Sequence, residues 1–150
     1  MMNRSPVIIA LGLGVVLAVF SDGCQNPAGN TVEPRRLVPR EQSYFADVPL
    51  PVGFTLVDKA SEDRMTGKRR LYVRHVYEGR SDTFATHSFY IEQMPLNKWT
   101  MLDRGVVNGV FTIHFEKGQE FCTVTISRAP GWNDRVRVEV LITQQERGAP

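Results

Sequence analysis

The sequence has few of the residues on which catalytic and metal sites most often depend. Among its 150 residues are two cysteines and three histidines. It contains no Gly-x-Ser-x-Gly, no His-Glu-x-x-His and no glycine-rich phosphate-binding loop. The net charge of +2 is small, whereas a nucleic-acid binder more often carries a strongly basic face. We therefore expect no nucleic-acid partner, no cofactor and no catalytic residue of a familiar type.

The three histidines are expected on separate elements. His75 shares the inward face of one predicted strand, His114 faces away from the apolar side of another, and His87 lies on a predicted helix. A zinc site needs several ligands around one point, so we expect no metal ion. One alternative stays open, because a strand in another register would pair two histidines with a carboxylate. A cleft that gathers a histidine and a carboxylate would favour an enzyme.

A long apolar run occurs only at the N-terminus. Arg4 precedes residues 7–20, which are all apolar or glycine, and the small residues Ser21 and Gly23 follow before Cys24. Such a run makes a helix of roughly 21 Å, which is short of the ~30 Å hydrocarbon core of a bilayer. We predict that residues 1–23 are a secretory signal peptide, with an uncleaved anchor as an alternative.

Cys24, directly after Gly23, resembles the lipobox cysteine of bacterial lipoproteins, although Ser21 and Asp22 depart from the residues usual there. The resemblance implies that Cys24 carries acyl chains and that a membrane is a partner. At ~0.8 kcal/mol per buried CH2, three chains hold a protein to a bilayer far more firmly than one. The expected location is therefore the cell envelope, with the domain facing the periplasm or the exterior. Ordinary cleavage and secretion of a soluble protein is the alternative.

Cys122 is expected to be a buried, inert thiol. It alternates with Val124 and Ile126 along a predicted strand, which places it on the apolar face. A disulfide to Cys24 is open in an oxidising compartment, but lipidation of Cys24 would leave Cys122 without an intrachain partner. The neighbouring Phe121 and Thr123 provide no positive, exposed surrounding for a reactive thiol.

Composition divides the rest of the chain into three parts. Residues 24–43 contain Pro27, Pro34 and Pro39 without a sustained apolar period, so we predict a flexible tether after the anchor site. Residues 44–146 have the length and patterning of a single domain. Residues 147–150 are predicted to be a polar tail.

Strand patterns occupy the first half of the predicted domain. Residues 54–58 form a short predicted strand, residues 59–67 are polar and are expected to be a loop, and residues 69–78 alternate strongly. Gly79 is expected to end that strand. The inward face of residues 69–78 is predicted to carry Leu71, Val73, His75 and Tyr77.

One helix follows. Ser81 or Asp82 can cap its first turn, and Pro95 should end it near Gln93 or Met94 because proline disfavours helical geometry in the residue before it. The apolar arc is broad, so the helix should lie flat on a sheet. The core residues expected here are Phe84, Ile91 and Met94, with Trp99 closing the end of the core.

The second half alternates as sheet over residues 99–103, 110–117, 120–128 and 135–143. Short polar turns between these segments favour antiparallel pairing. We therefore predict an α+β fold in the order β-β-α-β-β-β-β, with five or six antiparallel strands and one helix packed on one face as a two-layer sandwich.

Aromatic residues indicate a possible binding surface. Trp132 lies at an element boundary, and Tyr72 and Phe121 are on predicted outer strand faces. Grouped together, they would bind a peptide, a glycan or a partner strand. Arg135 and Arg137 add a small basic strip. The alternatives are that Trp132 covers a loop and that the arginines form an ordinary solvated face.

Four motifs occur in succession along the predicted domain: Asp47-Val48-Pro49-Leu50-Pro51-Val52-Gly53-Phe54, Phe89-Tyr90 with Met94-Pro95 and Trp99, Phe115-Glu116-Lys117-Gly118, and Cys122-Thr123-Val124-Thr125-Ile126. Together they resemble the pattern of a group of uncharacterised bacterial envelope lipoproteins. The shared pattern spans residues 47–126, with Lys98 where those proteins more often have glycine. The resemblance implies a cell-envelope location and an architecture but no activity.

Together these observations predict a non-enzymatic envelope lipoprotein. Its tethered domain is expected to bind or scaffold another envelope protein or a glycan, while lipidated Cys24 contacts the membrane. A secreted or periplasmic hydrolase-like enzyme, with a site that one sequence does not reveal, is the alternative.

Overall fold

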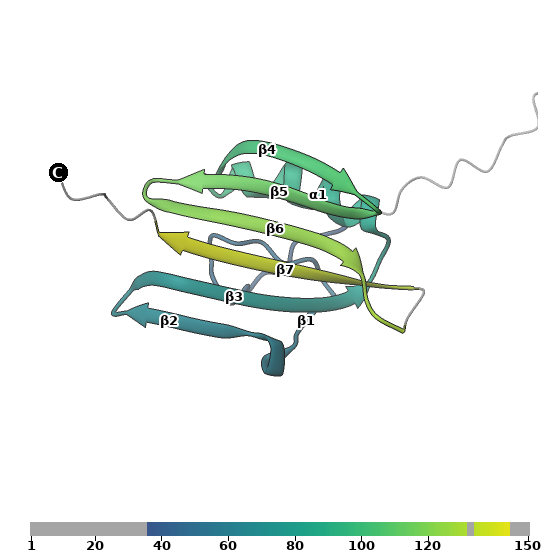
Figure 1. Cartoon of the computed structure of the whole chain (residues 1–150), viewed down its shortest axis with the longest axis horizontal. Helices are drawn as coiled ribbons and strands as arrows, with labels where there is room; N and C mark the ends of the chain where they lie inside the picture. Colours follow the sequence, from purple (N-terminus) through teal and green to yellow (C-terminus); the bar gives the residue numbers. More distant parts are fainter. Residues whose placement is uncertain (1–35, 132–133, 145–150) are drawn as a thin grey trace, which may run out of the picture. The chain divides into compact units, whose positions relative to one another are not determined.

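The computed structural model describes residues 36–131 and 134–144, which contain a seven-stranded sheet and one α-helix (Figure 1). The strands are β1 (Thr55–Leu56), β2 (Glu62–Thr66), β3 (Arg69–Arg80), β4 (Thr100–Val107), β5 (Val110–Lys117), β6 (Glu120–Arg128) and β7 (Arg135–Gln144). The helices are the 3-10 turn η1 (Asp58–Ala60) and α1 (Thr83–Leu96). The predicted α+β class with an antiparallel sheet is confirmed.

All strand pairings are antiparallel, in the order β1-β3-β7-β6-β5-β4, and β2 also pairs with β3. The strand count exceeds the predicted five or six because β2 lies inside residues 59–67, which were expected to be a loop. All its residues are exposed, so no apolar alternation marks it. A tight turn at Gly67, with φ of 59°, returns the chain to β3.

A register shift changes which side chains of β3 face inward. Arg64 pairs with Tyr72 but Met65 pairs with Arg70, so Leu71 is skipped as in a β-bulge. Leu71 is 44% exposed and Arg70 only 9% exposed, so the prediction of an inward Leu71 is wrong. Beyond the bulge the prediction is confirmed, because Val73, His75 and Tyr77 are all buried.

Gly79 does not end β3, which continues to Arg80. The ring of Phe54 packs directly on Gly79, and any Cβ at this position would clash with it. The glycine therefore serves a close approach within the strand and does not break it.

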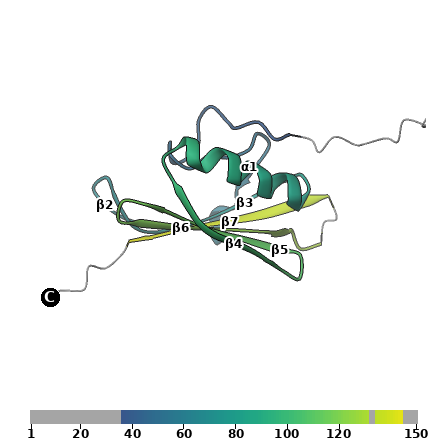
Figure 2. The same ribbon diagram turned by 90° about the horizontal axis from the view of Figure 1, so that it is seen from above.

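Helix α1 lies against one face of the sheet, in contact with β4, β5 and β6 (Figure 2). Asp82 caps it, since its Oδ1 accepts a hydrogen bond of 2.7 Å from the Ala85 N–H. Pro95 does not stop the helix at Met94 as expected. It lies inside the last turn, and the Met94 carbonyl still accepts from the Asn97 N–H at 3.0 Å.

The core lies between α1, the sheet and the segment before β1. Among the expected core residues, Met94 and Trp99 are buried, and Ile91 is partly buried and packs against the core. The prediction that Phe84 belongs to the core is wrong, because its side chain is 60% exposed. The buried side chains of α1 belong to a neighbouring stripe: Ala85, Thr86, Phe89, Tyr90 and Met94.

Part of the expected tether contacts the domain. The Arg40 N–H donates to the Leu50 carbonyl at 2.8 Å, the Val52 N–H donates to the Val38 carbonyl at 2.9 Å, and Leu37 packs against the core. Residues 24–35 of the expected tether, the signal segment 1–23 and the tail 147–150 lie outside the described residues.

The hairpin of β4 and β5 is longer than predicted. Residues 99–103 were expected to form its first strand, but β4 begins at Thr100 and continues to Val107. Asn108 and Gly109 make the turn with φ of 51° and 77°, as expected of an Asn-Gly hairpin. The last residues of β4 project as an exposed edge strand.

Candidate binding groove between helix α1 and edge strand β4

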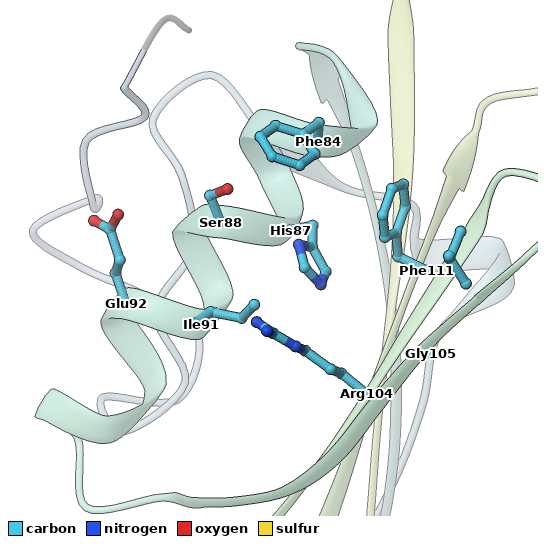
Figure 3. A pocket seen from close by; sticks show the side chains of 9 residues that line it. Phe84, His87, Ser88, Ile91, Glu92, Arg104, Gly105 and Phe111 are labelled. Carbon is cyan, nitrogen blue, oxygen red and sulfur yellow. The ribbon is translucent and has the colours of Figure 1, made fainter.

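A groove of about 500 Å³ separates the outer flank of α1 from β4 (Figure 3). One wall is the helix, and the other is formed by β4 together with one residue of β5. The lining residues are Phe84, His87, Ser88, Ile91, Glu92, Arg104, Gly105, Val106 and Phe111.

The groove lies in the region where the domain exposes most of its large apolar side chains. Six of the eleven large apolar side chains that are exposed among the described residues lie on α1 or β4. Two of them, Phe84 and Val106, line the groove itself. Exposed apolar side chains gathered at one place are more typical of an interaction site than scattered ones. The six are Phe84, Leu96, Met101, Leu102, Val106 and Val107.

The stripe of Phe84, Ser88 and Ile91 lines this groove. The same spacing had led to the expectation that Phe84 and Ile91 are core. The helix is apolar on two adjacent stripes, and the one through Phe89 and Tyr90 faces the interior. On the second stripe Ile91 is partly buried and packs against the core, whereas Phe84 is exposed. The second stripe leaves an apolar wall facing solvent.

Strand β4 adds unpaired backbone to the groove. Among the described residues it pairs only with β5, and all eight of its own residues are exposed. A register shift between Met101 and Asp103 interrupts the ladder, so regular pairing geometry extends from Asp103 to Val107. An edge strand presents alternate N–H and C=O groups that have no partner in its own sheet.

Two basic side chains enter the groove from opposite walls. Figure 3 shows His87 extending from α1 into the groove and Arg104 reaching from β4 to the side chain of Ile91. The His87 ring packs on Phe111 with centroids 4.7 Å apart. Partial burial lowers the pKa of His87 below its ordinary value, and the charge of Arg104 lowers this pKa further.

The positive charge of Arg104 is not balanced by a carboxylate within the groove. Glu92, on the opposite rim, forms an ion pair of 3.0 Å with Arg36. Within residues 36–131 and 134–144, no carboxylate forms an ion pair with Arg104. The groove therefore offers a positive charge beside an apolar wall and a free strand edge.

The binding surface expected from the sequence lies elsewhere, on the face of the sheet opposite α1. Tyr72 and Phe121 both pair with Thr143, which brings them near one end of that face. Arg135 and Arg137 are toward the other end of β7, where Arg137 forms an ion pair of 3.2 Å with Glu78. Trp132 lies outside the described residues. The structure thus places Tyr72 and Phe121 at one end of this face, on either side of Thr143, and the two arginines toward the other end.

The histidines do not share a site. His75 is 2% exposed, with Nε2 2.6 Å from Asp63 Oδ1 and Nδ1 2.8 Å from the Tyr77 hydroxyl. His114, on the face away from α1, lies 3.0 Å from the Thr123 hydroxyl. In the described part of the chain, no three His, Cys, Asp or Glu residues are grouped in a way that could hold a metal ion.

A second cluster of charges lies partly buried beside Trp99, whose ring contacts Arg70 and Lys117. Arg70 bonds to Asp47 and to Glu120, and Lys117 Nζ lies 2.9 Å from Asp47 Oδ2. Burial alone would raise the pKa of Asp47, but hydrogen bonds and charges from Arg70 and Lys117 outweigh it and lower that pKa to about 2. These groups satisfy one another, so the cluster holds the segment before β1 on the sheet and leaves no group for a ligand.

Cys122 is 1% exposed, so its predicted burial is confirmed. Burial raises the pKa of its thiol to about 12. A thiol of this kind is almost fully protonated at neutral pH and is a poor nucleophile. Cys24 lies outside the described residues.

Comparisons with protein-family models, with curated proteins and with solved structures find no match. Within the part that the structure describes, no helix has the length and apolar character needed to span a bilayer.

The groove was not predicted from the sequence, although one signal for it was available. Asn108-Gly109 lies between Val106-Val107 and Val110-Phe111, and this pattern indicates a long hairpin whose first strand is β4.

Proposed function

We propose that this protein is a non-enzymatic, lipid-anchored bacterial envelope protein. In this proposal its two-layer α+β domain binds an extended segment of another envelope protein, which adds to β4 and inserts a side chain into the groove. The N-terminal sequence supports the envelope location, since residues 1–23 have the pattern of a signal peptide and Cys24 that of a lipidation site.

The observation that carries the binding function is the continuity of groove and strand edge. Arg104 and Val106 line the groove, and both belong to the regularly paired part of β4. An added strand gains main-chain hydrogen bonds from the edge, and its alternate side chains enter the pocket beside it. One extended segment can therefore pair with the edge of β4 and fill the groove at the same time.

A catalytic role finds less support in the same geometry. His75 is buried and both of its ring nitrogens have partners, while His114 lies on the face away from the groove. His87 shares the groove with Glu92, but that carboxylate is engaged by Arg36 at the rim. The groove's histidine is therefore assigned to ligand binding.

The binding proposal is tested with the full chain purified in detergent. The probe is a short neutral peptide of alternating threonine and valine with a central phenylalanine. We expect slower hydrogen exchange for backbone amides between Asp103 and Val107, and weaker binding by about tenfold or more in Val106→Glu, because a carboxylate would enter the apolar wall.

Thr125→Glu is the matched control, since it places the same carboxylate on the face of β6 away from α1. Protection of β4 in this variant should equal that of the wild type. Absence of protection on β4, or peptide contacts confined to Tyr72 and Phe121, would overturn the proposed site. Binding of glycan fragments in place of peptides would overturn the proposed partner.

Lipidation is tested separately by the intact mass of the mature protein. The expected mass is that of the chain from Cys24 with attached acyl chains, and Cys24→Ser should abolish both the added mass and detergent partitioning. A mature chain with an unmodified Cys24 would contradict the anchor without affecting the groove.

A further inference from the structure

Resting on the proposed function, we infer that the groove selects segments carrying a carboxylate two residues from an apolar side chain, and that His87 makes their capture proton-linked. The carboxylate is placed against Arg104 and His87, and the apolar side chain against Val106 and Phe84. This assigns a chemical class to the partner and a pH response to its binding.

The two-residue spacing between the partner's carboxylate and its apolar side chain follows from the geometry of β4. Arg104 pairs with Ile113 and Val106 pairs with Phe111, so both side chains face the helix side of the sheet. Residues two apart on a strand lie on one face, roughly 7 Å apart. A segment added beside β4 repeats this period, so its residues opposite Arg104 and Val106 are also two apart.

The negative charge expected on the partner follows from the basic side chains that line the groove. Arg104 has no ion-pair partner in the described part of the chain, and His87 is the other basic group between the walls. Glu92 is the carboxylate lining the groove, and its bond to Arg36 holds it at the far rim. A carboxylate on the partner would gain a charge-assisted hydrogen bond from Arg104, whereas an amide would gain a weaker one.

The proton linkage follows from the surroundings of His87. The ionisable group that acts on it is Arg104 on β4, while Phe84 and Phe111 supply apolar contacts. Glu92, five residues along the same helix, lines the groove at the far rim, where it is paired with Arg36. In the free protein, burial and Arg104 disfavour the imidazolium. A bound carboxylate offsets the charge of Arg104 and favours the imidazolium. Binding therefore takes up a proton, and affinity rises as the pH falls.

A polypeptide explains the site better than a fatty acid, which also combines a carboxylate with an apolar chain. Along the regular part of β4, from Asp103 to Val107, the edge presents backbone donors and acceptors that only another strand satisfies in register. A fatty acid would fill the groove and leave this edge unpaired. The two occupants therefore differ in whether β4 amides become protected.

The test compares peptides that differ from the neutral probe in one respect. The first carries one glutamate two positions before the phenylalanine and another two positions after it. A glutamate therefore lies opposite Arg104 whether the peptide adds to β4 in parallel or antiparallel orientation. The second has glutamines at these positions, and the third has glutamates directly beside phenylalanine. We expect the first to bind about tenfold more tightly than the other two. The third should gain nothing because its carboxylates face the opposite side of the added strand.

Variants then assign the effect to the two basic residues. Arg104→Gln should remove the preference for the first peptide, whereas Lys68→Gln, which removes one positive charge in the turn between β2 and β3, should retain it. Lowering the pH from about 7.5 to about 5.5 should strengthen binding of the first peptide, whose glutamates stay ionised over this range. In His87→Gln this strengthening should disappear.

The outcomes separate this inference from the function on which it rests. Equal binding of all three peptides, with β4 amides protected, overturns the carboxylate selection and leaves strand addition standing. Tight binding of decanoate that depends on Arg104, without protection of β4, overturns both in favour of a lipid site. A pH effect that survives in His87→Gln overturns the proton linkage alone.

Discussion

Arg70 binds both carboxylate oxygens of Asp47, with Nη1 2.7 Å from Oδ1 and Nη2 2.8 Å from Oδ2. The pair joins the segment before β1 to the start of β3. The same guanidinium donates from Nε to Glu120 on β6 at 2.9 Å. The bulge at Leu71 makes this possible, because it turns Arg70 to the inner side of the sheet.

Replacing Arg70 with glutamine should therefore be strongly destabilising. It leaves Asp47 and Glu120 partly buried next to each other with less compensating charge, and we expect a loss of about 2–4 kcal/mol in the free energy of unfolding. Urea denaturation measures the loss. Arg36→Gln removes an exposed ion pair and should change stability by about 0.5 kcal/mol or less. Similar losses in the two variants would contradict the structural role of Arg70.

Stability should also depend on pH through Asp47. Its pKa falls from 3.8 to about 2 in the folded protein, so below pH 4 the unfolded chain binds this proton more readily. The stabilisation is complete above the unfolded pKa and is lost as the pH falls from about 4 through about 2. Urea midpoints measured across this range should decline in the wild type and decline less in Asp47→Asn. Parallel curves for the two proteins would refute the assignment.

The contact between Gly79 and Phe54 predicts a steric effect. Gly79→Ala places a methyl group where the Phe54 ring lies, and we expect a destabilisation of about 1–3 kcal/mol by denaturant unfolding. Gly105→Ala is the matched control on another strand, since its Cβ would have no atom within 4 Å. Phe54→Leu should reduce the cost of Gly79→Ala in a double-mutant cycle. An unchanged cost would mean that the clash is not the cause.

Sequence patterns predicted the central strands best. The bounds of β5 and β6 agree with the expectation because one side of each strand is buried and the other is not, which produces a regular alternation. At the edges this physical cause is missing. Strands β2 and β4 are exposed along their whole length, so burial imposes no pattern on β2 or on the second half of β4.

The same cause explains what was missed in the candidate site. A bulge cannot be seen in a hydrophobic pattern, and so Leu71 was expected inward where Arg70 lies. Phe84 and Ile91 both have core spacing, but only Ile91 packs partly against the core. Phe84 is exposed in the wall of an open groove, because α1 sits close to the edge of the sheet. Apolar spacing identifies a contact face, but it does not distinguish the protein's own core from a surface that binds a partner.

The buried bond between His75 and Tyr77 gives the last prediction. Nε2 of the imidazole lies 2.6 Å from Asp63 Oδ1 and donates to this carboxylate, and Nδ1 shares a hydrogen bond of 2.8 Å with the Tyr77 hydroxyl. Tyr77→Phe leaves this buried nitrogen without its hydrogen-bond partner and should cost about 1–2 kcal/mol in urea unfolding. Tyr72→Phe removes a hydroxyl from a half-buried side chain on the face away from α1, and there the change should stay below about 0.5 kcal/mol. Equal effects at both positions would show that the Tyr77 hydroxyl does not stabilise the native state through His75.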